Sequence, residues 1–381
     1  MKILYITHAR IPTEKAHGIN ITAMSEFFYQ KNIDFELILP NISNNIKEDP
    51  YVYYGIGHKF PIKKIRTVSA LRWEGVLGST AFWLQFWSFY ISAAFSLLFG
   101  SRKNTLIYSR DYFAGLLKLL GYRVVYECHS IPKNKKIFFI LTKLFYKIVV
   151  ISKGLHNYFV KEGFDEQKIF IAPDAVKLEK FDIDISISQS REKLSLPQNK
   201  NIICYCGKFK TMGMDKGIND ILKSLVNLPE DILFLAVGGS DQDIDYYQKI
   251  AHNLKVEGRV IFIGHVNQDI LAQYQKAANV LLMPFPYNQH YAQYMSPIKM
   301  FEYMASQRPI IASDLETIRE VLNNNNSIFC QADNPEDLAD KIKYIFNNPD
   351  KADSIAKQAH QDVQKYTWDN RASTILDFIK K

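Results

Sequence analysis

"SPIKMFEYMASQRPIIAS", residues 296–313, combines a helix that begins with a serine and a proline with a short apolar strand behind it. Serine is a favoured helix cap, and proline fits the first helical turn because its missing N–H would have no partner there. We therefore predict a helix over residues 297–306, capped by Ser296, and a strand over residues 309–313. A helix that leads into a strand is typical of a parallel sheet.

The same alternation runs through the rest of the second half. We predict further strands at residues 202–207, 232–239, 259–264, 279–285 and 327–330. Helical patterns separate them, around residues 217–227, 243–254, 268–277, 315–322 and 335–346. A polar stretch with one proline, residues 182–200, precedes the first of these strands, and we interpret it as a linker.

The first half repeats this organisation. Strands are predicted at residues 2–7, 34–40, 105–109, 123–129 and 147–152, and helices at 19–32, 112–121 and 153–163. A chain of 381 residues is too long for one hydrophobic core. The predicted fold class is therefore α/β, with two Rossmann-like αβα domains that face one another. The carboxyl ends of both sheets would then line a shared cleft, which should hold the active site.

The net charge of +8 is unevenly distributed, with +11 in residues 1–180 and −3 in residues 181–381. A basic first half suggests an anionic partner, either a membrane surface or a phosphorylated substrate, and the alternative is an ordinary lysine-rich surface. No nucleic-acid-binding motif is recognisable, so no nucleic acid is expected as a partner.

The four cysteines contain no C-x-x-C pair. We place Cys204 and Cys206 on opposite faces of their strand, and we expect neither a structural zinc site nor a disulfide framework. The N-terminus "MKILYITHARIP" lacks the apolar core and cleavage site of a signal peptide. These features predict a cytoplasmic protein, with a peripheral position on the inner face of the cell membrane as a further possibility.

Residues 75–100, "GVLGSTAFWLQFWSFYISAAFSLLFG", carry no charge and are long enough to cross a bilayer. A strand of the same domain follows at Thr105, however, so a crossing would divide one sheet between two compartments. The other two interpretations are a helix buried on the sheet and a helix partly exposed to the membrane interface. Tryptophans and basic residues around the segment keep the last interpretation open, with contact to an anionic membrane through residues 59–103.

Two short motifs of the first half suggest a ligand site. Gly18 stands where the loop after the first strand enters a helix, and there it would let a phosphate approach free backbone N–H groups. His129, in "YECHS", ends a parallel strand and would project toward a ligand. The alternatives are a plain turn glycine and a histidine with only a structural role.

In the second half, Gly207 and Lys208 end one strand, and Lys216 and Gly217 enter the next helix. Two lysines beside a βα loop suit a diphosphate leaving group, although ordinary surface lysines are the alternative. The stretch "DQD", residues 241–243, resembles a metal-binding D-x-D pattern, but helix capping by Ser240 or Asp241 explains it more simply. No metal and no cofactor are expected.

The helix that begins after Ser296 is a second predicted anion site, because its first N–H groups are free. Glu302 lies nearly two turns along this helix and could accept hydrogen bonds from both hydroxyls of a ribose. Lys299 stands three residues before Glu302, so it could pair with that carboxylate or reach a phosphate.

These motifs, in this order, resemble the family 4 glycosyltransferases. That family has the GT-B fold, retains anomeric configuration and uses nucleotide-sugar donors. The matching segments are residues 2–28, "YECHS" (126–130), residues 207–217, "VIFIGHV" (260–266), "ANVLLMPF" (278–285), residues 296–314 and "YTWDNRASTILDFI" (366–379). The 296–314 block is the most specific of them.

The resemblance implies a domain plan and a role for each candidate residue. Residues 1–180 would bind the acceptor, residues 181–365 would bind the donor, and a helix over 366–381 would return to the first domain. The catalytic set would be Lys208, Lys216 and His129. The donor-binding set would be Gly18, Gly207, Ser296, Ile298, Lys299 and Glu302. Many family members have a second glutamate eight residues before the ribose-binding one, and Tyr294 stands there in this chain.

We expect a retaining glycosyltransferase with a UDP- or GDP-linked sugar as donor and a glycan or lipid-linked acceptor, acting in cell-surface polysaccharide or glycolipid assembly. Because no carboxylate is placed as a nucleophile, we expect front-face substitution, in which the leaving diphosphate takes the proton of the incoming hydroxyl. The alternatives are a sugar-nucleotide epimerase of the same architecture and a non-catalytic nucleotide-sugar-binding scaffold.

Overall fold

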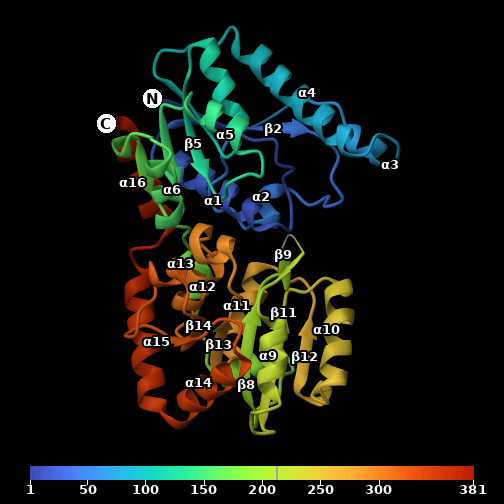
Figure 1. Cartoon of the computed structure of the whole chain (residues 1–381). Coiled ribbons are helices and arrows are strands. Elements are labelled where there is room, and N and C mark those ends of the chain that lie inside the picture. The colour runs from blue at the N-terminus through green and yellow to red at the C-terminus, as the bar shows by residue number, and fades with distance from the viewer. Residues whose placement is uncertain (212) are drawn as a thin grey trace. The chain divides into compact units, whose positions relative to one another are not determined.

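The computed structural model describes residues 1–211 and 213–381. The chain divides into two compact units (Figure 1). The first unit comprises Met1–Pro173 together with Trp368–Lys381, and the second comprises Asp174–Thr367. The C-terminal helix α16 (Trp368–Lys380) thus belongs to the first unit, to which the sequence analysis also assigns a returning helix over residues 366–381. The first stretch of this unit ends at Pro173, and the sequence analysis ends it at residue 180.

The first unit is built on a seven-stranded sheet with the strand order β3-β2-β1-β4-β5-β6-β7. All neighbouring strands are parallel. The strands are β1 (Lys2–Ile6), β2 (Asp34–Asn41), β3 (Ile62–Arg66), β4 (Thr105–Ser109), β5 (Arg123–Cys128), β6 (Lys147–Val150) and β7 (Ile169–Ile171). The carboxyl ends of all seven strands therefore lie at one edge of the sheet.

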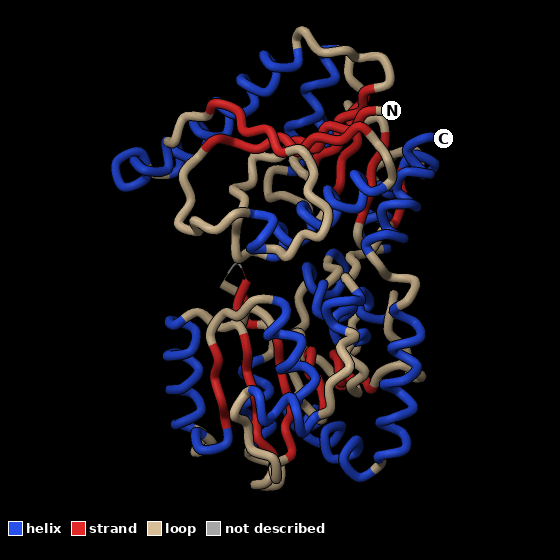
Figure 2. The backbone as a smooth tube through the Cα atoms, turned by 180° about the vertical axis from the view of Figure 1, so that it is seen from behind, coloured by secondary structure: helices blue, strands red, loops and turns tan. Residues whose placement is uncertain are grey.

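Helices pack around this sheet (Figure 2). They are α1 (Ala16–Gln30), α2 (Pro50–Tyr53), α3 (Glu74–Leu77), α4 (Ser79–Leu97), α5 (Lys135–Thr142) and α6 (Lys153–Lys161), with a 3₁₀ helix at Tyr112–Leu120. Helix α16 is attached to this unit by an ion pair of Lys31 with Asp369 at 2.7 Å and by stacking of Phe378 on Phe170.

The second unit contains a six-stranded parallel sheet with the order β12-β11-β8-β13-β14-β15. The strands are β8 (Asn201–Cys206), β11 (Ile232–Val237), β12 (Val260–Ile263), β13 (Val280–Met283), β14 (Ile310–Ser313) and β15 (Ile328–Cys330). A small antiparallel pair, β9 (Lys210–Thr211) and β10 (Met214–Asp215), follows β8. Alternate residues of β8 enter two separate apolar clusters, so both faces of this sheet are covered.

The helices of the second unit are α7 (Leu178–Phe181), α8 (Ile187–Lys193), α9 (Ile218–Leu225), α10 (Asp241–Asn253), α11 (Gln268–Ala277), α12 (Ile298–Ala305), α13 (Glu316–Arg319), α14 (Pro335–Asn347) and α15 (Pro349–Val363). As predicted, Ser240 caps α10 by accepting a hydrogen bond from the Asp243 amide at 3.2 Å.

The predicted strands and the α/β class are confirmed, with strand ends displaced by one or two residues. Two predictions are wrong. The stretch 182–200 is not a simple linker, because it contains α8, whose Arg191 is buried and donates a hydrogen bond to the carbonyl of Ala277 at 2.9 Å. Cys204 and Cys206 share one face of β8 with their sulfurs 3.6 Å apart, since residues two apart in a strand point the same way.

Helix α4 covers most of residues 75–100, for which the sequence analysis leaves three interpretations. One face of it is buried on the first unit through Phe86, Phe89, Tyr90 and Ala93. Its other face leaves a row of apolar side chains exposed: Phe82, Trp83, Leu84, Trp87, Ile91 and Phe95. Among the residues described, no helix combines the length and the apolar character needed to span a bilayer. The helix is therefore partly buried and partly exposed.

Candidate functional site

The start of α12 differs from the prediction. Helix α12 begins at Ile298, and Pro297 is its N-cap with an extended backbone, so Pro297 is outside the first turn. Ser296 does not cap the helix, because its hydroxyl accepts a hydrogen bond from the Asp174 amide at 2.9 Å. The predicted cap is therefore wrong. No other side chain caps the start of α12 either. Its first N–H groups and the positive end of its dipole are available to an anion.

Lysine side chains gather near this helix start. Lys208 follows Gly207 at the end of β8, and Lys216 precedes α9. Burial, and secondarily the charge of Lys208, lower the pKa of Lys216 to about 8. A bound anion would stabilise the charged form of Lys216, which agrees with the role that the sequence analysis assigns to the two lysines.

Lys299, on the first turn of α12, is buried. Its ammonium lies 3.4 Å from the centre of the Tyr205 ring and donates no hydrogen bond to any of the residues described. A Cβ on Gly207 would stand 3.3 Å from this ammonium, and Gly207 has φ +116°, so only glycine suits this position. Burial and the charge of Lys216 hold the pKa of Lys299 well below its usual range. Lys299 forms no ion pair with Glu302, although the negative charge of Glu302 acts to raise the pKa of Lys299.

Glu302 lies one turn further along α12 and is 6% exposed. Burial raises the pKa of its carboxyl to about 7, while Lys299, Gln275 on α11 and Lys180 work in the opposite direction. The carboxylate is therefore close to half ionised at neutral pH before any ligand binds. A buried acid with this pKa on a helix that begins an anion site is a typical feature of functional sites.

Asp215 is a residue of this region that the sequence analysis did not identify. Its carboxylate accepts hydrogen bonds from the amides of Gly217 and Ile218 at 2.5 and 2.9 Å, and from the Tyr247 hydroxyl at 3.0 Å. It thus occupies the start of α9, which is not a free anion site. A Cβ on Gly217 would lie 1.9 Å from the Pro284 carbonyl oxygen, so this glycine packs the loop after β10 against the end of β13. An aspartate two residues before a glycine at a helix start was the available signal.

In the first unit, His129 follows β5 and lies on a buried network. Its Nε2 is 2.5 Å from Glu127, which also pairs with Arg371 of α16 at 3.1 Å. Arg371 and the hydrogen bond from His129 hold the pKa of Glu127 well below its usual range despite burial. Burial and Arg110 lower the pKa of His129 to about 3. His129 is thus neutral and donates its Nε2 proton to Glu127. Sequence reasoning missed this network, although Glu127 stands in the same motif "YECHS", and it could not find Arg371, which lies 244 positions further along the chain.

Gly18 lies in the first turn of α1, as predicted, but the space beside it is filled. A Cβ there would stand 2.2 Å from the hydroxyl oxygen of Tyr54, which follows α2. That hydroxyl accepts a hydrogen bond from the Thr13 amide at 2.7 Å. The close approach of Tyr54 therefore requires a glycine at this position. A phosphate beside Gly18 stays a prediction.

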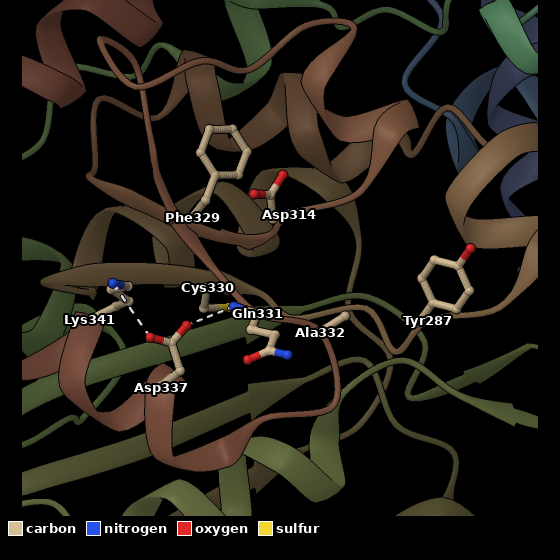
Figure 3. A pocket seen from close by; sticks show the side chains of 8 residues that line it. All are labelled: Tyr287, Asp314, Phe329, Cys330, Gln331, Ala332, Asp337 and Lys341. Atoms are coloured by element: carbon tan, nitrogen blue, oxygen red, sulfur yellow. Dashed lines mark hydrogen bonds and ion pairs between the residues drawn. The ribbon is translucent and has the colours of Figure 1, made fainter.

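A pocket of about 520 Å³ lies where β14 and β15 end (Figure 3). Asp337 lines this pocket. Its carboxylate accepts a hydrogen bond from the Gln331 amide at 2.7 Å and pairs with Lys341 at 3.4 Å. The lining residues are Tyr287, Asp314, Phe329, Cys330, Gln331, Ala332, Asp337 and Lys341. None of them belongs to the predicted site, and its lysine is already neutralised by a carboxylate, so we do not assign the donor to this pocket.

The fold is that of solved glycosyltransferases of the GT-B class. HepE from Anabaena, solved in complex with UDP, superposes with a TM-score of 0.73 and 15% sequence identity over 100% of both chains. At this identity the likeness shows the architecture alone. It confirms the predicted fold class.

Residues 186–362, which lie within the second unit, match the model of the family described as Glycosyl transferases group 1. The uncharacterized glycosyltransferase MJ1607 of Methanocaldococcus jannaschii is 25% identical over 242 residues, which are 61% of this chain and 60% of that protein. A D-inositol 3-phosphate glycosyltransferase of Xylanimonas cellulosilytica is 24% identical over 224 residues, 56% of this chain and 52% of that protein. The chain thus spans less than two thirds of either relative.

Proposed function

We propose that this protein is a retaining glycosyltransferase that moves a sugar from a nucleoside diphosphate sugar to a hydroxyl of a glycan or lipid-linked acceptor. The observation that carries the proposal is the uncapped start of α12, with Lys216 and Lys299 nearby and Glu302 one turn along the same helix. The helix start and the lysines suit a diphosphate, and the glutamate suits the two hydroxyls of a ribose. The matched family domain includes all of these residues.

The chemical roles follow from charge. As the bond between the anomeric carbon and the diphosphate oxygen breaks, negative charge develops on the diphosphate, and Lys208, Lys216 and the helix dipole stabilise it. In front-face substitution the incoming hydroxyl gives its proton to the departing diphosphate oxygen while its own oxygen bonds to the anomeric carbon from the same side. We propose that no metal is needed, because the lysines supply the positive charge. Activity that survives EDTA supports this role of the lysines, and activity that is lost with EDTA and restored by Mg²⁺ contradicts it.

Donor hydrolysis tests the proposal without knowledge of the acceptor. The full chain is incubated with a panel of UDP-, GDP- and ADP-sugars, and the release of free nucleotide is measured. We expect release from one nucleotide series, with water as the acceptor. Release of an altered but intact nucleotide sugar would instead indicate an epimerase, and tight donor binding without any turnover would indicate a scaffold. The configuration of the released sugar, read by NMR before it mutarotates, tests retention.

Variants of the lysines link this reaction to the site. Lys216→Ala should weaken binding of the nucleoside diphosphate by about 10- to 100-fold, because a charge-assisted contact to a phosphate is lost. Lys223→Ala is the matched control, since Lys223 is exposed on α9 and outside the site. Equal affinity of both variants for the nucleotide would refute the assignment of Lys216. Lys208→Ala with undiminished transfer would refute that of Lys208.

We propose in addition that the exposed face of α4 contacts an anionic membrane, where a lipid-linked acceptor would be found. Ile91 and Phe95 are each 67% exposed on this face, and Phe99 beyond its end is 89% exposed. Apolar side chains in such a row are costly in water and favourable at the acyl boundary of a bilayer. Charge supports the same partner, because Lys63, Lys64, Arg66, Arg72, Arg102 and Lys103 around the helix are all exposed. A position on the inner face of the cell membrane would follow.

Vesicle flotation tests this contact. Trp83 and Trp87 also pack against Phe113, so changing them together disturbs the fold of the first unit. Ile91→Glu combined with Phe95→Glu is a cleaner change, because both side chains project from the unit. We expect this variant to lose binding to phosphatidylglycerol vesicles while it keeps donor hydrolysis. Tyr287→Glu combined with Tyr344→Glu, at exposed positions of the second unit, is the control. Undiminished vesicle binding by the α4 variant would count against the contact.

A further inference from the structure

A second pocket, of about 700 Å³, adjoins the pocket of Figure 3 in the second unit. Asp314, Phe329 and Lys341 line both pockets, so the two form one groove, which we call the β15 groove. Six successive residues, 327–332, line it, and they include β15, the last strand of its sheet. A groove that follows a strand in this way is elongated. It suits a chain-like ligand better than a single small molecule, which proteins usually enclose.

Helix α14 lines the same groove with one of its faces. Its lining residues follow one another at spacings typical of a single helix face: Asp337, Asp340, Lys341 and Tyr344. Hydrogen bonds hold the backbone around the first pocket. The Asp337 carboxylate accepts one from the Gln331 amide at 2.7 Å, and Asp333 accepts one from the Tyr287 amide at 2.8 Å. The lining is therefore ordered before a ligand binds, which lowers the entropic cost of binding.

The charged groups of the β15 groove balance one another. Three carboxylates and three cations line it, namely Asp314, Asp337 and Asp340 with Arg319, Lys341 and Lys351. Each carboxylate lies close to a cation, at 2.8 Å for Asp314 and Arg319, 3.4 Å for Asp337 and Lys341, and 3.4 Å for Asp340 and Lys343. An anion such as a nucleotide is attracted by excess positive charge, which these residues do not offer. The groove therefore suits a ligand without net charge.

Aromatic rings stand in both parts of the groove. Tyr287 lines the first pocket, Tyr344 lines the second, and Phe329 lines both. The two tyrosines are 67% and 44% exposed, whereas the guanidinium of Arg319 lies over Phe329, 3.9 Å from the centre of its ring. An exposed tyrosine ring offers a flat apolar surface with few rotatable bonds to fix. Each part of the groove thus has one tyrosine ring available for stacking.

Polar groups of the groove can serve hydroxyls. Arg319 donates two hydrogen bonds to Asp314, which lower the pKa of this carboxyl and keep it ionised at neutral pH. The Asp314 side chain is nevertheless 47% exposed, so its oxygens can accept further hydrogen bonds. Asn324 and Gln331 are exposed and add amides that both donate and accept. A hydroxyl, which also donates and accepts, is the polar group that such a mixed set matches.

We propose that the β15 groove binds a segment of an uncharged glycan, with sugar rings stacked on Tyr287 and Tyr344 and sugar hydroxyls bonded to Asp314 and its neighbours. A sugar ring carries C–H groups on its faces and hydroxyls along its edge, so it presents apolar and polar surface in the arrangement that the groove offers. None of the donor-site lysines lines this groove, and binding there requires no nucleotide.

In the proposed reaction such a glycan is an acceptor or a product, and this part of the inference rests on the proposed function. A chain that is held in the groove stays at the protein between two transfers, which raises the effective concentration of its reacting end. Binding of the glycan itself does not depend on any transfer.

Glycan binding is measured with the full chain and without nucleotide sugar. An array of neutral and acidic oligosaccharides is screened first, and the neutral oligosaccharide that binds best is then used in titration calorimetry. We expect neutral oligosaccharides of several units to bind with an affinity that does not change with salt concentration, because no net charge is involved. Saturating UDP should leave this affinity unchanged. Failure of every neutral oligosaccharide to bind, or displacement by UDP, would overturn the proposal.

Variants of the two tyrosines connect this binding to the groove. Tyr287→Ala and Tyr344→Ala should each lower the affinity for the oligosaccharide by about tenfold or more, because aromatic side chains carry much of the binding energy at such contacts. Circular dichroism checks that the variants fold, as expected for exposed side chains. Tyr29→Ala, at an exposed position of α1 in the first unit, is the matched control. Tyrosine variants that bind as tightly as the wild type would contradict the assignment.

A spin label locates the bound glycan independently of these variants. The four native cysteines are buried, so a cysteine introduced at an exposed position can be labelled selectively. Asn325→Cys lies beside Asn324 of the groove, and Gln248→Cys on α10, next to β12 at the opposite end of the sheet, is the control. The label at position 325 should broaden the NMR signals of the oligosaccharide, and the label at 248 should not. Equal effects of both labels would place the glycan elsewhere.

The outcomes separate this inference from the proposed function. A protein that hydrolyses no nucleotide sugar but binds the oligosaccharide through Tyr287 and Tyr344 would keep the groove and lose the transferase. An active transferase whose oligosaccharide binding ignores both tyrosines would lose the groove and keep the proposed function.

Discussion

Glu302 gives the sharpest test of the proposed donor site, because its burial has a cost that depends on pH. Its pKa is raised from 4.5 to about 7, chiefly by burial. Between these two pH values the folded protein holds a proton at Glu302 that the unfolded chain has released. Stability must therefore fall as pH rises through this range. A difference of about 2.5 units at 1.36 kcal/mol per unit corresponds to about 3 kcal/mol at and above pH 7.

Glu302→Gln removes this cost, since glutamine stays neutral. At pH 4.5 the variant and the wild type should melt together. At pH 8 the variant should melt higher, by up to about 6–12 °C, because 1 kcal/mol shifts the melting temperature of a unit of this size by about 2–4 °C. The same variant should bind UDP more weakly at pH 8, because an ionised carboxylate accepts hydrogen bonds from ribose hydroxyls better than an amide does.

Calorimetry is the suitable assay. All four tryptophans, at positions 73, 83, 87 and 368, belong to the first unit, so their fluorescence does not report the unfolding of the second. Glu192→Gln is the matched control, because Glu192 is exposed on α8. The reasoning is refuted if Glu302→Gln and the wild type show the same dependence of melting temperature on pH, or if the variant is the less stable of the two at pH 8.

Three further predictions concern single positions. Gly217→Ala should destabilise the second unit by about 2 kcal/mol more than Gly163→Ala destabilises the first; both glycines have a positive φ, but a Cβ would meet the Pro284 backbone at Gly217 and nothing at Gly163, and calorimetry measures both. Arg371→Met should cost the first unit about 3–5 kcal/mol by leaving Glu127 buried without its cation, and adding Glu127→Gln should restore part of the loss, which tryptophan fluorescence can follow. UDP affinity, measured by titration calorimetry, should decrease above pH 8 as free Lys216 loses its proton, and Lys216→Arg should abolish this decrease.

Interpretation from the sequence succeeded where a local pattern carries the information. Apolar runs such as residues 232–237 are strands because both faces of a parallel sheet are buried, and burial is visible in composition alone. Strand β3, "IKKIR", was missed, because an edge strand with exposed lysines lacks that composition. Helix α8 was missed because a short polar helix near the start of the second unit resembles a linker until its capping box is noticed.

In the candidate site, sequence reasoning identified residue types but not their partners. Ser296 was expected to cap α12, and it bonds Asp174 instead, a residue 122 positions away. His129 was expected near a ligand, and its neutral state depends on burial and on the distant Arg110, whereas Glu127 acts to raise its pKa. Helix-cap rules consider only neighbours along the chain, so they cannot include a competing donor from another segment.

By itself, the sequence determined the alternation of strands and helices, the α/β class and the glycine and lysine positions of the loop after β8, because these depend on periodicity and on local turn chemistry. Only the tertiary structure decided which of these groups are charged. Burial and neighbours from remote segments give Glu302 a pKa of about 7 and Lys216 one of about 8, and they leave Nη1 of Arg110 without an acceptor among the residues described. The free energy of a charge depends on everything packed around it, and that is set by the fold rather than by adjacent residues.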